Sequence, residues 1–532
     1  MAKLIVIMSG RVSSGKTTLA ASLASQFGLL HIKTLDFLKA LGSEVALERG
    51  ALQALGEKLD RRTNGAWVCD ELLKLARQAP EDSIVVLDSV RIPGQVEAIR
   101  KAYGPRILHV HLDADLKVLA ERYSTRPHHG IQELKSYDEV QENRTERNVV
   151  HLEKIADVVI KTDRCTKRDV LIRIASHIGL YGREYLRLVD VIVGGQYGSE
   201  GKGQIAAFLA REYDYLIRVG GPNAGHTVFQ EPEPYTFHHL PSGTNSSSAK
   251  LIIAPGAVVY VPTLMKEIAD CSVEADRLSI DPQAMIISEA DKRREASLIK
   301  NIGSTGQGVG RATARRVLRG KHVKLAKDVK LLRPFIRPVR ELLEEAFCSR
   351  KRVLLEGTQG TGLSLYHGQY PFVTSRDTTV AGCLAEAGIA PSRVQLVVLV
   401  CRTYPIRVQS PQDGTSGEMS QEIDWEAVAE RSGHDAGELR KAELTSTTKR
   451  QRRVSEFDWE LLRKAATLNA PTDIALTFVD YLSKDNVQAR RFEQLQDKTI
   501  LFIEEVERVA AAPVSLISTR FHSRSIIDRR MW

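Results

Sequence analysis

Residues 188–203 read LVDVIVGGQYGSEGKG, and this stretch determines the fold that we predict for the larger part of the chain. It begins with the mostly apolar run at 188–194, which is typical of a parallel-sheet strand buried on both faces. A glycine-rich turn follows at Gly194–Gly203, and we expect a helix to begin near Lys202. Glycines bring backbone N–H groups close to a phosphate, and a helix N-terminus adds a partial positive charge. The stretch therefore predicts a strand, an anion-binding turn and a helix.

The N-terminus repeats this order of elements. Residues 3–9 (KLIVIMS) predict a buried strand, and residues 10–18 (GRVSSGKTT) fit the pattern G-x-x-x-x-G-K-[ST]. In such a loop the backbone at the two glycines holds phosphates, the lysine neutralises β/γ oxygens and the next hydroxyl holds Mg²⁺. These roles predict a nucleotide site formed by Gly10, Gly15, Lys16, Thr17 and Thr18, with Thr17 as the metal ligand.

Further strand-like runs lie at 83–87, 107–112 and 157–160, and helical stretches alternate with them. This alternation is typical of an α/β doubly wound fold. We expect two P-loop-type α/β domains, at residues 1–184 and 185–532, because the second strand–turn–helix unit begins just after this boundary.

Composition limits the classes of function. The chain has 532 residues and a net charge of +9, yet its basic residues are spread out and form no standard nucleic-acid module, so we do not expect nucleic-acid binding. No window approaches the roughly 18 unbroken apolar residues of a membrane helix. The six cysteines have no metal-ligand or redox spacing. With no targeting segment, a cytoplasmic location is expected.

The first domain has the size of a nucleoside-monophosphate kinase, and acids and arginines follow its predicted strands. The segment at 87–104 (LDSVRIPGQVEAIRKAYG) resembles that of deoxynucleoside-monophosphate kinases, without fixing the base or the sugar. Arginines suit an acceptor phosphate because they bind it bidentately. The candidate acceptor and lid residues are Asp36, Arg61, Arg62, Asp88, Arg91, Arg122, Arg126, Arg144 and Arg147.

In the second domain, several specific blocks follow the glycine turn in a fixed order. They are GGPNAGHT (220–227), IGSTGQGVG (302–310), EGTQGTGLSLYHGQYPFVTS (356–375), TSTTKRQRR (445–453) and TDIALTFVD (472–480). This ordered set resembles the adenylosuccinate synthetase family across nearly all of residues 188–532. The resemblance implies a ligase that phosphorylates O6 of a 6-oxopurine nucleoside monophosphate with a nucleoside triphosphate and Mg²⁺, and then joins L-aspartate at C6.

The resemblance also implies roles for individual residues. Lys202 and the glycine loop stabilise the transferring phosphoryl group, and His226 matches the general acid. The backbone carbonyl of Gly225 matches a Mg²⁺ ligand, and Arg319 matches an arginine supplied across a homodimer interface. The residues matched to the substrate nucleotide are Asn223, Ser304, Thr305, Arg319, Gln359 and Thr374. Those matched to aspartate are Thr448, Arg450 and Arg452. Those matched to the triphosphate are Gly198, Gly201, Lys202, Gly203, Asp480 and Ser518.

The chain departs from the family at Ser199, where most members carry the aspartate that acts as general base and binds Mg²⁺. A hydroxyl does not replace a carboxylate in either role at its ordinary pKa. The Ser form resembles the branch of 2-aminoadenylosuccinate synthetases that use dGMP. A smaller side chain near N1 of the purine is compatible with a 2-amino group. Ser199 therefore favours dGMP over IMP, although it remains the candidate at the catalytic and metal position.

Two more departures concern the triphosphate. Phe478 stands where many members have lysine, two residues before the base-reading Asp480. At residues 518–521 (STRF), Arg520 and Phe521 follow the Ser/Thr pair where many members have Gly-Pro. Both make ATP or dATP an alternative to GTP. The sequence therefore predicts a bifunctional enzyme, a dGMP-favouring ligase with a nucleotide kinase. An IMP- and GTP-using adenylosuccinate synthetase with an appended kinase and a catalytically silent nucleotide sensor remain as alternatives.

Overall fold

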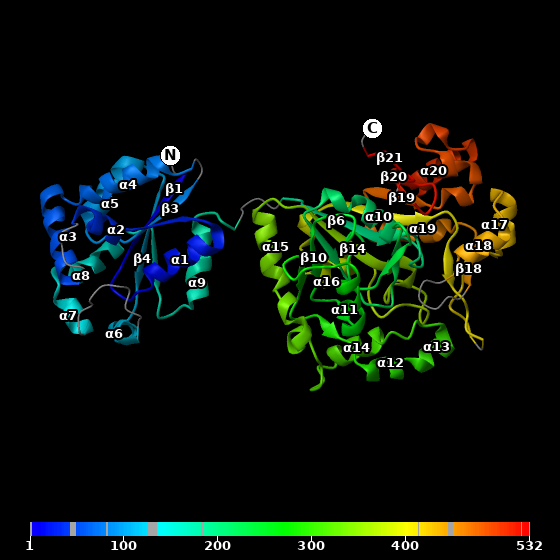
Figure 1. Cartoon of the computed structure of the whole chain (residues 1–532), viewed down its shortest axis with the longest axis horizontal. Helices are drawn as coiled ribbons and strands as arrows, with labels where there is room; N and C mark the ends of the chain where they lie inside the picture. Colours follow the sequence, from blue (N-terminus) through cyan, green and yellow to red (C-terminus); the bar gives the residue numbers. More distant parts are fainter. Residues whose placement is uncertain are drawn as a thin grey trace. The chain divides into compact units, whose positions relative to one another are not determined.

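The computed structural model describes residues 3–42, 49–80, 83–125, 136–181, 186–412, 414–444, 451–522 and 524–530, apart from the side chains of residues 49, 296 and 297. The chain forms two compact units, Met1–Arg183 and Glu184–Trp532, which we call unit 1 and unit 2 (Figure 1). Each is a mixed α/β structure built on a parallel sheet, as the alternating elements predict.

Unit 1 contains a five-stranded sheet in the order β2-β3-β1-β4-β5, and every neighbouring pair is parallel. Its strands are β1 (Leu4–Ser9), β2 (Leu30–Lys33), β3 (Ile84–Asp88), β4 (Ile107–Asp113) and β5 (Val158–Lys161). Its helices are α1 (Lys16–Phe27), α2 (Thr34–Leu41), α3 (Arg49–Thr63), α4 (Ala66–Gln78), α5 (Pro93–Tyr103), α6 (Leu116–Thr125), α7 (Tyr137–Glu142), α8 (Arg144–Asn148) and α9 (Lys167–His177). The strands expected at 3–9, 83–87, 107–112 and 157–160 are confirmed to within one residue at each end.

Helices cover both faces of this sheet, and alternate side chains of β1 point to opposite layers. Ile5 and Ile7 pack with α4 and α5 in one apolar cluster, whereas Val6 and Met8 pack with α1 and α9 in another. Figure 1 shows α1 and α9 on one side of the sheet and α4 and α5 on the other. Burial of both faces is the reason that these strands read as continuous apolar runs.

Unit 2 is built on a nine-stranded sheet in the order β12-β10-β7-β14-β6-β15-β19-β20-β21. Its strands are β6 (Val189–Gly194), β7 (Tyr215–Arg218), β10 (Lys250–Ile253), β12 (Leu278–Ile280), β14 (Val353–Gly360), β15 (Val394–Arg402), β19 (Asp473–Thr477), β20 (Val514–Ser518) and β21 (Ile526–Asp528). Neighbouring strands are parallel except for the final pair, β20 and β21. The carboxyl ends of the parallel strands therefore meet at one edge of the sheet, where ligands bind in open α/β sheets.

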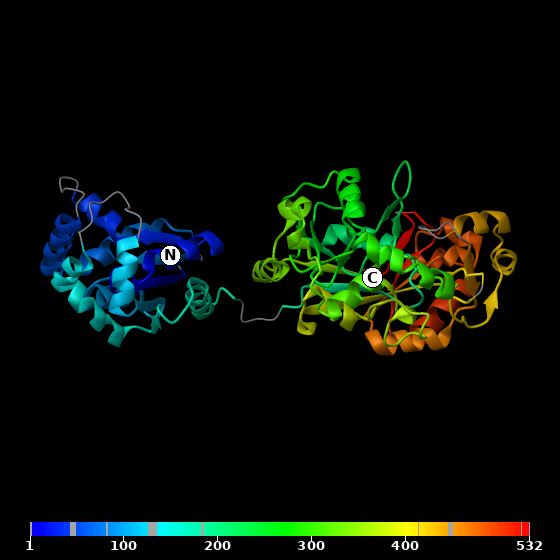
Figure 2. The same cartoon turned by 90° about the horizontal axis from the view of Figure 1, so that it is seen from below.

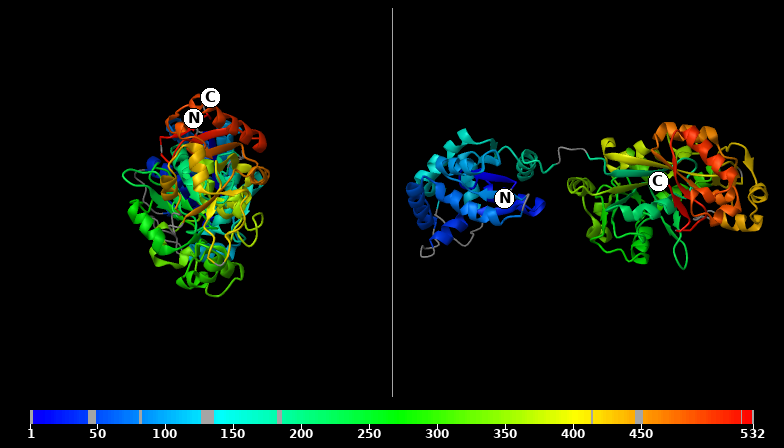
Figure 3. Two further views of the ribbon diagram at one scale, coloured as in Figure 1. Left: turned by 90° about the vertical axis from the view of Figure 1, so that its right-hand side faces the viewer. Right: turned by 90° about the horizontal axis from the view of Figure 1, so that it is seen from above.

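Helices and small sheets surround this central sheet (Figures 2 and 3). The helices are α10 (Lys202–Leu209), α11 (Val261–Asp270), α12 (Glu289–Arg294), α13 (Ala296–Ile302), α14 (Val309–Val317), α15 (Val339–Cys348), α16 (Val380–Ala387), α17 (Trp425–Ser432), α18 (Ala436–Ala442), α19 (Trp459–Asn469) and α20 (Asp497–Ala510). The remaining strands are β8 (His226–Val228), β9 (Tyr235–Phe237), β11 (Val258–Val259), β13 (Met285–Ile286), β16 (Ile406–Val408), β17 (Glu422–Ile423) and β18 (Arg452–Ser455).

The strand β6 forms the centre of unit 2, and all of its residues are buried. Val191 and Val193 pack into one apolar layer with α19 and α20, and Ile192 packs into the opposite layer with α10 and α11. Within the described residues, no helix is both long and apolar enough to cross a membrane.

Candidate functional site

In unit 1 the phosphate loop connects β1 to α1, and the Lys16 side chain binds backbone carbonyl groups of this loop. Gly10 has a φ of 133°, and a Cβ there would lie 1.8 Å from the carbonyl oxygen of Leu112, so only glycine fits. The ammonium of Lys16 donates to the carbonyl oxygens of Gly10 at 2.9 Å and Arg11 at 2.7 Å. Gly15 precedes the helix with a φ of 98°, which directs the N-terminus of α1 into the loop. The loop therefore brings the Lys16 ammonium and the N-terminus of α1 to one place.

Beside this loop, the hydroxyl of Thr17 binds the carboxylate of Asp88 at the end of β3. Thr17 Oγ1 donates to Asp88 Oδ2 at 2.7 Å, and His31 Nε2 lies 3.8 Å from the same oxygen. Burial alone would raise the pKa of Asp88, but His31, Lys16 and Thr17 together hold this pKa below its ordinary value. A hydroxyl and an ionised carboxylate beside phosphate oxygens are the donors that Mg²⁺ prefers. The pair therefore fits the metal of a nucleoside triphosphate.

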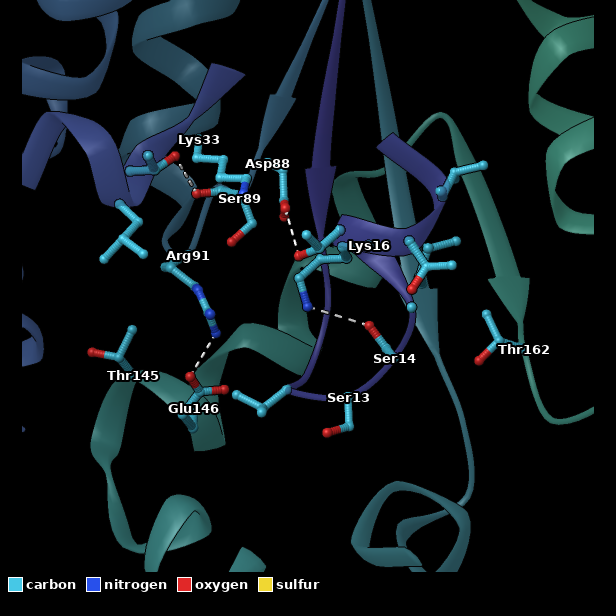
Figure 4. Close-up of a pocket in the computed structure, with 18 of the residues that line it drawn as sticks. Ser13, Ser14, Lys16, Lys33, Asp88, Ser89, Arg91, Thr145, Glu146 and Thr162 are labelled. Carbon is cyan, nitrogen blue, oxygen red and sulfur yellow. Dashed lines mark hydrogen bonds and ion pairs between the residues drawn. The ribbon is translucent and has the colours of Figure 1, made fainter. Parts of the chain in front are cut away.

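The loop opens into a cavity of about 790 Å³ that extends to both sides of it (Figure 4). One side of the cavity lies at the carboxyl ends of β4 and β5, and Arg122 and Thr162 line it. The other side lies at the carboxyl ends of β2 and β3, and Asp88 and Arg91 line it. In Figure 4, Thr162 lies across Lys16 from Arg91. Of the residues expected from the sequence, those that line the cavity are Gly15, Lys16, Thr17, Thr18, Asp88, Arg91 and Arg122.

The two arginines of the cavity are held by neighbouring side chains. Arg91 Nη1 donates to Glu146 Oε1 at 2.6 Å, and Figure 4 shows the two side chains pointing toward each other. Arg122 donates to Thr162 through Nη1 at 2.8 Å and, to the carbonyl oxygen, through Nη2 at 3.0 Å. Arg91 therefore lies on the β3 side and Arg122 on the β5 side.

The structure does not bring the other expected kinase residues to this cavity. Arg61 lies in the last turn of α3, where its side chain is 80% exposed and pairs with Glu57 at 3.4 Å. The expectation that Arg61 grips an acceptor phosphate is corrected on this ground. The remaining residues are exposed and outside the cavity lining, namely Asp36, Arg62, Arg144 and Arg147. Arg126 lies outside the described residues.

In unit 2 the glycine turn lies between β6 and α10, and Glu200 organises it. Glu200 Oε1 accepts the backbone N–H groups of Gln196 at 3.0 Å and Gly198 at 2.8 Å, and Oε2 lies 2.5 Å from Lys202 Nζ. Lys202 also donates to the carbonyl oxygen of Gly198 at 3.2 Å, and its side chain is buried. Gly201 caps α10 with a φ of 87°. A buried lysine therefore lies at the N-terminus of α10, inside a turn whose backbone N–H groups are held by Glu200.

Ser199 lies at the exposed tip of this turn. Its carbonyl oxygen accepts from Arg402 Nη1 at 3.4 Å, so the buried arginine at the end of β15 holds the backbone of the turn. The position expected for a general base therefore carries a small, exposed hydroxyl.

His226 packs directly against the start of α10. A Cβ at Gly203 would lie 2.8 Å from the Cβ of His226, so the glycine makes room for the histidine. The His226 Nδ1 atom pairs with the buried carboxylate of Glu356, which also binds Ser242 and lies 3.7 Å from Arg218. Burial and the charge of Arg218 lower the pKa of His226 to about 4, although Glu356 acts against this. Burial and neighbouring cations therefore favour the neutral form of the imidazole.

The opposite ring nitrogen of His226 is the chemically available one. Nε2 is buried, and among the described residues it has no hydrogen-bond partner. A buried polar atom of this kind costs free energy unless a ligand satisfies it. The histidine is therefore oriented by Glu356 and presents Nε2 to a bound group.

Three residues expected at the substrate phosphate and purine lie together at the ends of β7 and β14. Gln359 Nε2 donates to Thr374 Oγ1 at 3.0 Å, and Asn223 Nδ2 lies 3.4 Å from the same hydroxyl. Gln359 adopts a φ of 60°, and a Cβ at Gly198 would lie 3.1 Å from its Cα. The glycine turn, the NAGHT block and the EGTQG block therefore meet at one place.

Two further candidates, Ser304 and Thr305, lie on the segment that joins α13 to α14. Ser304 Oγ accepts the backbone N–H of Gly306 at 3.2 Å, and the carbonyl oxygen of Thr305 accepts from Gln307 at 3.2 Å. Gly225 precedes β8 and directly adjoins His226. Arg319 is exposed, with a φ of 52°, just after α14. Arg319 is therefore a solvent-exposed residue beside the C-terminus of α14.

Glu443 forms a buried hub beside the glycine turn. It pairs with Arg402 Nη2 at 2.7 Å and Arg452 Nη1 at 3.0 Å, and it accepts the Tyr481 hydroxyl at 2.8 Å. Burial would raise the pKa of Glu443, but Arg402 and Arg452 lower it to about 2. The hub holds Arg452 at the start of β18. Thr448 and Arg450, the other residues matched to aspartate, lie outside the described residues.

The expected base-reading residues follow β19. The guanidinium carbon of Arg402 lies 4.1 Å from the centre of the Phe478 ring, a cation–π geometry. Asp480 is buried, and His434 Nε2 lies 3.6 Å from its Oδ2, whereas Oδ1 has no hydrogen-bond partner among the described residues. Burial raises the pKa of Asp480, although His434 opposes this. At the end of β20, Ser518 Oγ donates to the carbonyl oxygen of Arg520 at 3.0 Å.

Sequence reasoning missed the acids that organise these cations. Glu356 opens the block at 356–375, and Glu200 lies inside the glycine turn, so both are visible in motifs without a role. Glu443 and Arg402 stand outside every block, 41 residues apart, and only the fold brings them together. No local pattern in the sequence signals that pair.

Comparison with known proteins places unit 2 among characterised enzymes. The family model described as "Adenylosuccinate synthetase" matches residues 191–327 and 320–488. The adenylosuccinate synthetase of Methanocaldococcus jannaschii is 40% identical over 349 residues, which cover 64% of this chain and 96% of that protein. The adenylosuccinate synthetase of Thermococcus onnurineus is 37% identical over 348 residues, covering 64% of this chain and 98% of that protein.

Two solved structures share the fold of unit 2. Fully ligated adenylosuccinate synthetase from Plasmodium falciparum has a TM-score of 0.57 and 22% identity, covering 64% of this chain and all of that chain. The succinoaminodeoxyadenylate synthetase of cyanophage S-2L, bound to dGMP and to dATP as an energy donor, has a TM-score of 0.53 and 25% identity. It covers 65% of this chain and 96% of that chain.

Proposed function

This chain belongs to the adenylosuccinate synthetase family, and we propose that its unit 2 joins L-aspartate to C6 of dGMP while its unit 1 acts as a nucleotide kinase. The ligase reaction forms a carbon–nitrogen bond and would yield an N6-succinyl-2-amino-2'-deoxyadenylate. IMP with GTP is the alternative in the same class. A silent nucleotide sensor is the alternative from another class.

The observation that carries the ligase proposal is the contact between the glycine turn and His226. The turn holds the buried ammonium of Lys202, and the adjoining imidazole offers a buried Nε2 that no described residue satisfies. A transferring phosphoryl group with charge on its oxygens fits between a cation and this nitrogen. The negative charge of that group would raise the pKa of His226, so that the imidazole holds a proton where charge develops.

The two steps then follow from the residues at this edge of the sheet. O6 of the purine attacks the γ-phosphorus of the triphosphate, and the bond between that phosphorus and the β–γ bridging oxygen breaks. Lys202 and the turn would stabilise the leaving diphosphate, and the Gly225 carbonyl would help to hold a Mg²⁺ ion, which would neutralise phosphate charge. The aspartate amine then attacks C6, and the C6–O6 bond breaks as phosphate leaves.

Ser199 is the residue that favours dGMP over IMP. N1 of a 6-oxopurine loses its proton as O6 is phosphorylated, in IMP and in dGMP alike, and because the Ser199 hydroxyl is a poor base, this proton would pass to water at the exposed turn. The same exposed, short side chain leaves space beside the 2-position, where dGMP carries an amino group. The likeness to a cyanophage enzyme that is bound to dGMP supports this choice. The remaining substrate contacts proposed for the nucleotide are Asn223, Ser304, Thr305, Gln359 and Thr374.

ATP or dATP is the proposed phosphoryl donor. The donor base would lie beside Asp480, whose Oδ2 lies 3.6 Å from His434 and whose pKa is raised by burial. Guanine needs an ionised carboxylate that accepts from both N1–H and the 2-amino group. Phe478 stacks on Arg402 where many family members offer a lysine. The loss of that lysine weakens the case for guanine, so ATP or dATP is proposed as the donor.

We also propose a homodimer in which Arg319 enters the partner's site. Arg319 follows Val317 and Leu318, whose side chains are 72% and 79% exposed. Adjacent exposed apolar side chains beside an arginine are typical of an interface.

The kinase proposal rests on Lys16, Thr17 and Asp88 at the mouth of the unit 1 cavity. Together they supply the cation, the hydroxyl and the carboxylate that a triphosphate with Mg²⁺ requires.

Replacement of one residue tests the substrate proposal directly. The variant Ser199→Asp restores a carboxylate, and we expect it to raise turnover of IMP relative to dGMP by at least about tenfold. Succinylated product is measured with each nucleotide, aspartate and each triphosphate. A ratio that does not change would remove Ser199 from the explanation. Product from no purine monophosphate, together with tight nucleotide binding, would favour the sensor.

A further inference from the structure

The side of the unit 1 cavity that faces β2 and β3 is where a phosphoryl acceptor must bind. The Thr17–Asp88 pair lies on this side of the phosphate loop, and it would hold a Mg²⁺ ion that accompanies the triphosphate. The γ-phosphate is therefore directed toward β3, and the base of the donor extends toward Thr162 and Lys167. We call the β2/β3 side the acceptor half.

Among the residues that the structure describes, the acceptor half carries more carboxylates than cations. Among the described residues that line it, the carboxylates are Glu57, Asp60, Asp88 and Glu146, whereas the cations beyond Lys16 are Lys33 and Arg91. Arg91 already pairs with Glu146 at 2.6 Å, and Lys33 is exposed at the end of β2 (Figure 4). A phosphomonoester with a charge near −2 at pH 7 would meet more carboxylates than cations in a partly buried site. This half is therefore poorly suited to a nucleoside monophosphate.

Asp60 and Gln95 line the same half, and hydrogen bonds hold both side chains in place. Asp60 Oδ1 accepts from Trp67 Nε1 at 2.7 Å and from Gln95 Nε2 at 2.9 Å. Gln95 Oε1 accepts the backbone N–H of Arg91 at 2.7 Å, and the Gln95 side chain is buried. Burial raises the pKa of Asp60, although Trp67 and Gln95 oppose it. Carboxylate oxygens bind hydroxyl and amino groups of a ligand, and they repel phosphate oxygens.

Apolar side chains complete the acceptor half. Leu35 and Leu38 of α2, Leu52 of α3 and Trp67 of α4 line it, and Trp67 is held in position by its bond to Asp60. A flat, apolar ring with polar groups at its edge matches such a wall better than a sugar alone does.

We propose that unit 1 phosphorylates a hydroxyl group of a nucleoside, and not the phosphate of a nucleotide. This inference rests on the proposed kinase activity of unit 1 and replaces its nucleotide acceptor with a nucleoside. The hydroxyl oxygen forms a bond to the γ-phosphorus of ATP, the bond from that phosphorus to the β–γ bridging oxygen breaks, and the hydroxyl proton is taken up by an oxygen of the transferred phosphoryl group. The products are ADP and a nucleoside monophosphate, the class of compound that the ligase of unit 2 consumes.

The test offers the full-length chain γ-labelled ATP with Mg²⁺ and two matched panels, the nucleosides and their 5'-monophosphates. Transferred label is measured by chromatography, with Lys16→Ala as the blank. We expect label in nucleoside monophosphates, with kcat/KM at least about tenfold higher for a nucleoside than for its own monophosphate. A tenfold margin in kcat/KM corresponds to a difference of about 1.4 kcal/mol in activation free energy, which is about the size of one unpaired charge contact.

Two results would overturn the inference in distinguishable ways. Faster transfer to the monophosphates, giving diphosphates, would reject the nucleoside acceptor and keep the kinase. No transfer to either panel, from a preparation whose ligase is active, would reject the kinase and the acceptor together.

A variant links the result to the acceptor half. Asp60→Asn is expected to raise KM for the nucleoside about tenfold while KM for ATP changes less than about twofold. The control is Asp70→Asn, an exposed position on α4 outside the cavity lining. An equal change of both KM values in Asp60→Asn, or the same change in the control, would contradict the role of Asp60.

Discussion

Glu356 on β14 binds Nδ1 of His226 on β8, and the two residues are 130 positions apart in the chain. This contact fixes which ring nitrogen faces the glycine turn, because Nδ1 is occupied and Nε2 is not. We therefore expect Glu356→Gln to lower kcat of the ligase about 100-fold with a smaller effect on KM, since the misoriented imidazole fails mainly at the transition state. Steady-state kinetics with succinylated product as the readout measure this.

The substitution in Glu356 also leaves Arg218 near an uncharged amide, so folding must be checked. Ser242→Ala is the matched control, because it removes another partner of the same carboxylate and keeps the charge. A Glu356→Gln protein whose unfolding temperature equals that of the unaltered protein, and whose kcat is also unchanged, would contradict the orienting role.

The two phosphate loops are expected to serve separate reactions. Lys16→Ala should abolish the kinase and leave the ligase, and Lys202→Ala should abolish the ligase and leave the kinase, each by about 1,000-fold because a charge at the transferring phosphoryl group is lost. Each protein is assayed for both products. Loss of both activities in one single variant, with an unchanged unfolding temperature, would show that the reactions depend on a common site.

Unit 1 is expected to lose stability in mild acid. The side chains of His109 and His111 are both buried against Ser9 Oγ, at 2.7 Å and 2.8 Å. Burial lowers the pKa of each to about 4, below the value of about 6.5 in an unfolded chain. The unfolded state therefore binds more protons between these values, and stability present above pH 6.5 is lost as the pH falls toward 4. We expect about 2 kcal/mol for each histidine.

The measurement uses the fluorescence of Trp67 in urea, in a chain whose other tryptophans are replaced by phenylalanine. His109→Gln should reduce the fall in the free energy of unfolding between pH 6.5 and pH 4.5. A fall of the same size in this variant would assign the acid sensitivity to other groups.

Phe478 is expected to influence the choice of phosphoryl donor. Its ring stacks on Arg402 where many family members carry lysine. Phe478→Lys should raise kcat/KM for GTP relative to ATP by about tenfold or less, because it adds a cation beside Asp480 that favours the ionised carboxylate. The ratio for the two donors is measured at fixed dGMP and aspartate. Phe478→Leu is the control, and an identical ratio in both variants would contradict this explanation.

Parts of the fold follow from the sequence because their cause is local. The strands β1 and β6 were predictable from apolar runs, since both faces of each are covered by helices. The turns after them were predictable because Gly10, Gly15 and Gly201 adopt positive φ values that other residues disfavour.

The rest depends on contacts between distant segments. Glu443 joins Arg402, Arg452 and Tyr481 only after β15, β18 and the segment that follows β19 have assembled. The direction of a long side chain is likewise set by packing, and Arg61 faces solvent at the end of α3 although its position in the chain suggested the cavity. A charged residue in the sequence is therefore a candidate for a site, but the position of its side chain depends on the fold.

The most direct test of the central claim is a substrate panel with the native protein. Purified full-length chain is given aspartate and Mg²⁺ with IMP, GMP or dGMP, and with ATP, dATP or GTP, and succinylated product is quantified. The account predicts product from dGMP with ATP or dATP, at a kcat/KM at least about tenfold above that for IMP. Efficient turnover of IMP with GTP, and none of dGMP with any donor, would contradict it.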